Sequence, residues 1–64
     1  MSKSSRDVIK ILKAYGWELV RVTGDHHQFK HAANPGKVTV PHPSKDLTIG
    51  TLKSIERQSG LKLR

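Results

Sequence analysis

The sequence contains no cysteine, which excludes disulfide bonds, zinc–thiolate sites and thiol nucleophiles. It has no apolar run long enough to cross a membrane, and its polar first residues lack the apolar segment of a signal peptide. A cytoplasmic protein without a membrane partner is therefore expected. Acidic residues are scarce, at five against twelve lysines and arginines, so the formal net charge is +7. Such a charge attracts polyanions, although a lysine-rich soluble surface would have the same composition.

The chain is also short. Its 64 residues are expected to form one domain, spanning 1–64. A chain of this size buries only about 60% of the surface that its unfolded form exposes, so the core must be small. A deep pocket for a small molecule is not expected. Any chemistry should take place on an open surface, against a large substrate.

Hydrophobic periodicity predicts a helix near each end of the chain. The first is capped by Ser4 or Ser5 and ends at Gly16. The second is capped by Thr48 and ends at Gly60. Spacings of three and four residues place an apolar stripe on each helix. The expected stripes are Val8, Ile11, Leu12 and Tyr15 on the first helix, and Ile49, Leu52 and Ile55 on the second.

Between the helices, alternating apolar residues predict three strands. They are expected over residues 17–23, 26–31 and 37–40, with Val38 and Val40 facing inward. Both faces of the first strand carry apolar groups, so alternation does not decide which face is buried. The order predicts an α+β fold, α-β-β-β-α, in which a three-stranded antiparallel sheet carries both helices on one face. The other face of the sheet is left open.

Turn-forming residues mark the connections between these elements. Gly24 allows a tight turn between the first two strands. Residues 32–36 (AANPG) are expected to form the next turn, and the prolines in 41–43 (PHP) end the pairing. Residues 44–47 (SKDL) then form a polar connection to the second helix.

Three of the four histidines lie within six residues of one another, directly after the glycine turn. Alternate side chains of a strand share a face, and Phe29 marks the buried one. The open face is expected to carry His26, Gln28 and Lys30. An exposed imidazole near a lysine is a candidate for acid–base chemistry on an anion. His27 and His31 are expected beside Phe29, packed or bonded to the backbone rather than reactive.

Other interpretations of these side chains are open. His27 and His31 lie four residues apart, but on a strand this spacing separates them by about 13 Å, which disfavours a shared metal ion. Trp17 and Tyr15 could stack on bases, although their place at a helix–strand junction favours packing. His42, between two prolines, either closes the end of the sheet or contacts nucleic acid.

Four stretches of the chain carry a family resemblance. They are residues 15–17 (YGW), 21–27 (RVTGDHH), 38–43 (VTVPHP) and 47–55 (LTIGTLKSI). In this order they resemble the HicA family of toxins from type II toxin–antitoxin pairs. The resemblance implies a fold similar to the double-stranded-RNA-binding domain, and an endoribonuclease that cleaves messenger RNA and stops translation. It also implies a HicB-like antitoxin that covers the catalytic histidine.

The family's turn motif is glycine, serine, histidine, which matches Gly24, Asp25 and His26 with aspartate in place of serine. The resemblance therefore implies that His26 is the catalytic residue. A carboxylate beside an imidazole stabilises its protonated form, which favours the acid over the base at neutral pH. Asp25 also places negative charge near the approaching phosphate. We expect it to modulate the activity, through a lower rate or a stronger dependence on pH.

RNA carries its own nucleophile in the 2′-hydroxyl, so its cleavage requires proton transfer and a cation, but no metal or other cofactor. His26 is expected to be the general acid or base. The residues expected to contact RNA are Gln28, Lys30, Lys37 and Lys45. DNA lacks the 2′-hydroxyl and should resist cleavage. The alternatives are a non-catalytic RNA-binding module of the same fold and a protein-interaction domain without RNA affinity.

Overall fold

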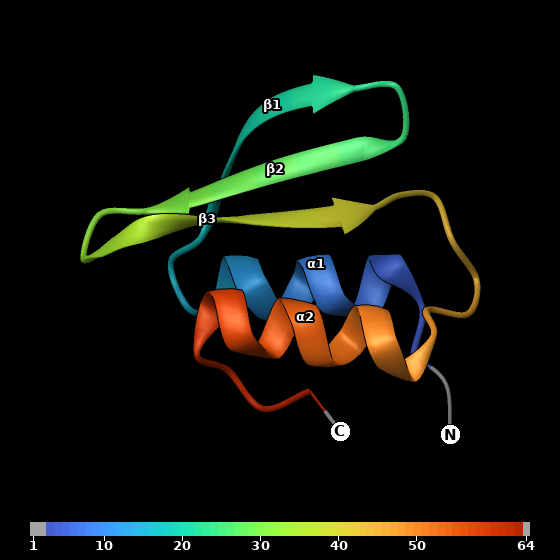
Figure 1. Ribbon diagram of the computed structural model, residues 1–64. Helices are drawn as coiled ribbons and strands as arrows, with labels where there is room; N and C mark the ends of the chain where they lie inside the picture. Colours follow the sequence, from blue (N-terminus) through green and yellow to red (C-terminus); the bar gives the residue numbers. More distant parts are fainter. Residues whose placement is uncertain (1–2, 64) are drawn as a thin grey trace.

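The computed structural model describes residues 3–63, which follow the predicted order of helix, three strands and helix (Figure 1). The elements are α1 (Ser5–Ala14), β1 (Glu18–Thr23), β2 (His26–His31), β3 (Asn34–Pro41) and α2 (Ile49–Ser59). The strands form an antiparallel sheet in the order β1-β2-β3, and both helices lie on one of its faces. The predicted α+β architecture is confirmed. Residues 1, 2 and 64 of the expected domain lie outside the described part.

Local hydrogen bonds set the ends of both helices. The Oγ atom of Ser4 caps α1 by accepting a hydrogen bond from the N–H of Asp7 at 3.2 Å. Thr48 caps α2 in the same way, accepting from the N–H of Thr51. Gly60 ends α2 in a left-handed conformation, with φ +75°. None of the helices within residues 3–63 is long and apolar enough to cross a membrane.

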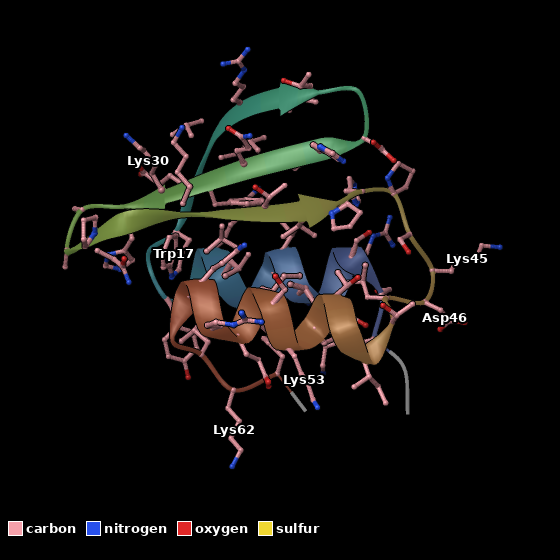
Figure 2. All side chains as sticks on the ribbon, viewed as in Figure 1. Trp17, Lys30, Lys45, Asp46, Lys53 and Lys62 are labelled. Atoms are coloured by element: carbon pink, nitrogen blue, oxygen red, sulfur yellow. The ribbon has the colours of Figure 1, made fainter. Side chains whose placement is uncertain are left out.

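The core lies between the helices and the central part of the sheet. Phe29 of β2 and Val38 and Val40 of β3 face the helices, as predicted. Trp17 is 3% exposed and packs into the same layer (Figure 2), which confirms packing rather than base stacking for this side chain. The buried hydrophobic residues are Val8, Leu12, Trp17, Phe29, Val38, Val40, Leu47, Leu52, Ile55 and Leu63.

Two predicted members of the helical stripes are exposed. Tyr15 is 62% exposed because it lies one residue past the end of α1, where the helical spacing no longer applies. Ile49 is 60% exposed, since it is the first residue of α2, which begins near the end of the sheet (Figure 1). Two core residues were not predicted, Leu47 and Leu63. The connection over 44–47 is therefore not wholly polar.

The prediction of a turn over residues 32–36 is wrong. Only residues 32 and 33 form the turn, and β3 begins at Asn34, which pairs with His31. The register shifts beside this pair, so Pro35 and Gly36 lie in a bulge of β3 rather than in a loop. The side chain of Asn34 accepts the Gly36 N–H at 2.9 Å, and Pro35 has no N–H to leave unpaired.

The two edges of the sheet differ. All six residues of β1 are exposed, and its apolar residues Leu19, Val20 and Val22 remain uncovered because the helices pack on β3 rather than on β1. A bulge interrupts β1 between Leu19 and Arg21. At the opposite edge, Gln58 of α2 accepts a hydrogen bond from the backbone N–H of Thr39 at 3.1 Å. A helix thus covers part of the β3 edge, whereas β1 is open.

Candidate functional site

A two-residue turn at the end of the sheet sets the position of His26. Thr23 and His26 are the last pair of the β1–β2 ladder, and Gly24 and Asp25 join them. Gly24 has a φ of +60°, a conformation that favours glycine. The side chain of His26 lies on the face opposite the buried Phe29 and is 62% exposed. The outward orientation predicted from alternation is confirmed.

The Asp25 carboxylate lies beside this imidazole. Its Oδ1 atom is 3.7 Å from His26 Nε2, and the Asp25 side chain is 73% exposed. The carboxylate and the imidazole attract each other when the ring is protonated, but water around both groups weakens the attraction. The turn therefore places one negative charge directly beside the candidate catalytic ring.

The open face of the sheet carries cations in register with the predicted residues. Gln28 lies opposite Arg21 of β1, and Lys30 lies opposite Glu18 of β1 and Lys37 of β3. Cross-strand partners share a face, so these side chains stand together. Sequence reasoning did not single out Arg21, although counting back from the two-residue turn places it opposite Gln28. Its Nε atom donates to Thr23, the partner of His26, at 3.2 Å.

The lysines are divided between the two ends of the sheet. Lys30 and Lys37 pair at the end far from His26, since β2 starts at His26 and four residues of strand span about 13 Å. Lys45 lies in the loop after β3, at the end of the sheet that carries His26 (Figure 2). Of these three lysines, Lys45 is therefore the one at the same end of the sheet as His26.

His42 follows β3 and closes the end of the sheet, which was one of the two roles considered for it from the sequence. Its N–H donates to the Asp25 carbonyl at 2.7 Å, one step beyond the His26–Pro41 pair. Its ring stands edge-on to that of His27, with centroids 4.8 Å apart. Its Nδ1 atom lies 2.7 Å from Oγ of Ser5, the first residue of α1. The two contacts of the ring, with His27 and with Ser5, were not predicted. The Ser5–His42 contact joins residues 37 apart in the chain.

His31 has a structural role at the other end of β2. Its Nε2 atom hydrogen-bonds the Tyr15 carbonyl at 2.8 Å, and its Nδ1 atom accepts the Ala33 N–H at 2.9 Å. Its ring packs against Trp17, with centroids 5.2 Å apart. Bonding to the backbone, as predicted for this histidine, is confirmed. Within the part of the chain that the structure describes, no group of three or more histidine and acidic side chains is placed to hold a metal ion.

The chain matches a known protein family over almost all of the residues that the structure describes. A family model described as HicA toxin of bacterial toxin-antitoxin matches residues 5–61. A search of curated proteins found no match. The matched span begins with α1 and includes the sheet, the histidine turn and α2.

Proposed function

The chain belongs to the HicA toxin family of bacterial toxin–antitoxin systems, and we propose that it is an endoribonuclease that cleaves messenger RNA without a metal ion, with His26 as a general acid or base. The observation that carries this proposal is the position of His26. Its ring is exposed at the end of the sheet face that is open to a long substrate, and both helices lie on the other face. A neutral face of the same shape would not attract RNA, but this face carries Arg21, Lys30 and Lys37.

The proposed reaction needs one proton removed and one supplied. A base takes the proton of the RNA 2′-hydroxyl as its oxygen attacks the phosphorus, and an acid gives a proton to the departing 5′-oxygen. The products are a 2′,3′-cyclic phosphate and a 5′-hydroxyl. Imidazole suits either transfer because its ordinary pKa of about 6.5 lies near neutral pH. His26 performs one of the two transfers, while Arg21 and the lysines hold the flanking phosphates.

The family also implies an antitoxin partner. We propose that a HicB-like antitoxin covers His26 and the open sheet face, and so keeps RNA away from the site. The charge supports a partner with an acidic surface, because the free chain carries +7.

The test is a cleavage assay of the purified protein on single-stranded RNA, with DNA of the same sequence and with a chelator. Cleavage of RNA alone, unaffected by chelator and lost in His26→Ala, supports the proposal. His31→Gln is the matched control, since it removes a backbone-bonded histidine from the far end of the same strand. If native protein and His26→Ala both shift RNA on a native gel and neither cuts it, the chain is an RNA-binding module without catalysis.

A further inference from the structure

His42 is a second histidine at the end of the sheet that carries His26, and its ring has more contacts than that of His26. Its backbone is tied to the turn before His26 by the 2.7 Å hydrogen bond to the Asp25 carbonyl. Its ring is fixed on one side by His27 and at Nδ1 by Ser5. These contacts engage Nδ1 and leave the other ring nitrogen, Nε2, outside them, on a residue that is half-buried.

The hydroxyl of Ser5 that holds this ring is itself fixed. Ser5 is 1% exposed, and its Oγ accepts the Ser44 N–H at 2.8 Å and lies 3.1 Å from the Ser44 carbonyl. The Ser5 N–H donates to the same carbonyl at 2.8 Å. The start of α1 and the loop after β3 thus close around one buried oxygen, which places His42.

The hydrogen-bonding capacity of this oxygen favours one form of the imidazole. A serine hydroxyl accepts two hydrogen bonds and donates one. If His42 carries its proton on Nδ1, Ser5 accepts from both Nδ1–H and the Ser44 N–H and donates to the Ser44 carbonyl, so all three of its bonds are made. If Nδ1 is bare, the hydroxyl must turn to it and abandon the carbonyl. The complete arrangement therefore leaves Nε2 with a lone pair in neutral His42.

We propose that His42 is the second proton-transfer residue of this site, and that Ser5 positions it by holding the proton on Nδ1. This inference rests on the proposed ribonuclease function. The phosphate would lie beyond the ends of β2 and β3, reached by His26 from the open face and by His42 from the helix side. One histidine takes the 2′-hydroxyl proton and the other supplies a proton to the 5′-oxygen, so protons balance. The Nδ1–H···Oγ bond survives both steps, because only Nε2 gains or loses a proton.

Titratable and charged groups from each surrounding element lie at this end of the molecule. They are His27 from β2, Asp25 from the β1–β2 turn, Arg6 from α1 and Lys45 from the loop after β3. Arg6 and Lys45 line a shallow cavity of about 380 Å³ together with Ser5 and Ser44. Their positive charges attract the RNA backbone to the side of the sheet end where His42 lies.

The test compares the pH–rate profiles for RNA cleavage of native protein, His42→Asn, Ser5→Ala and His27→Asn, with His31→Gln at the far end of β2 as the matched histidine control. Asparagine keeps a hydrogen-bonding group near Ser5 but does not titrate. We expect native protein to give a bell-shaped profile. His42→Asn should bind RNA as before, lose about 100-fold or more in rate and lose one limb of the profile. Ser5→Ala should lower the rate less, and nitrogen NMR should show the neutral His42 proton moving from Nδ1 to Nε2.

The possible results distinguish this inference from the proposed ribonuclease function on which it rests. A native protein that cuts RNA through His26, with rate and both limbs unchanged in His42→Asn, overturns the role of His42 alone. Loss of the limb in His27→Asn instead assigns the transfer to His27. A native Nε2–H form overturns the role of Ser5 whatever the activity. If His42→Asn does not fold, the Ser5→Ala rate and NMR spectra decide. A native protein that cuts no RNA at any pH overturns both proposals.

Discussion

The Nε2 atom of His31 lies 2.8 Å from the carbonyl oxygen of Tyr15, and in this position it fills the space where residue 16 would carry a side chain. A Cβ atom on residue 16 would lie 2.8 Å from the same nitrogen. Gly16 also has a φ of +92°, in the region that disfavours other residues. The junction between α1 and β1 therefore needs glycine for two independent reasons.

Gly16→Ala should destabilise the fold by about 1–3 kcal/mol for the backbone strain, and by more for the displaced His31 ring. Urea unfolding measures the loss. Gly60→Ala is the matched control, since Gly60 also has a positive φ of +75° but has open space where a Cβ atom would lie, with no other atom within 4 Å. Equal losses at the two positions would contradict a specific contact with His31.

Asp25→Ser should raise the rate of RNA cleavage. The Asp25 carboxylate lies 3.7 Å from His26, so its removal takes away a negative charge that repels the RNA phosphate at this ring. Both side chains are largely exposed, so the gain should be a few-fold at most and should shrink at high salt. A cleavage assay at low and at high salt measures this change, and an unchanged rate would contradict the modulating role of Asp25.

Arg21→Gln and Lys30→Gln should weaken RNA binding and its salt dependence. Each lost phosphate contact should reduce the slope of log K against log salt by about 0.7 for a single strand. Lys53→Gln and Lys62→Gln remove the same charge on the helix side of the molecule (Figure 2) and serve as controls. If all four variants weaken binding equally in a salt titration, only net charge matters and the open face is not the interface.

Leu63→Ala should destabilise the fold by about 2–5 kcal/mol, because Leu63 is 3% exposed and belongs to the core. Leu61→Ala, at a partly buried neighbour, should cost less. Ile49→Ser should change stability little, since its side chain is 60% exposed. Urea unfolding of the three variants tests this order. A larger loss at Ile49 than at Leu63 would mean that the helical stripe, rather than the observed packing, describes the core.

Local signals predicted the elements of this fold because each depends on neighbours in the chain. The caps Ser4 and Thr48 bond backbone groups three residues away, and Gly16 and Gly60 after the two helices have the positive φ that glycine favours. Alternation from Phe29 likewise placed His26 on the open face. These features need no knowledge of the remaining structure.

Burial and long-range contacts could not be predicted in this way. The exposure of Leu19 and Val22 follows from where the helices end across the sheet, which no pattern within β1 encodes. Leu47 is buried and forms a backbone bridge with Lys3, which precedes α1 near the start of the chain. The contact between Ser5 and His42 belongs to the same class, since only the folded arrangement brings α1 to the end of β3.

The cover that Gln58 provides for β3 limits how copies of this protein can associate through their sheets. With one edge partly occupied by its own helix, the sheet accepts a further strand most readily beside β1. If two copies paired through their β1 strands, the open edge of each copy would be covered by the other. Association of this kind would close at a pair rather than continue into a fibre, although β1 exposes the apolar side chains of Leu19, Val20 and Val22.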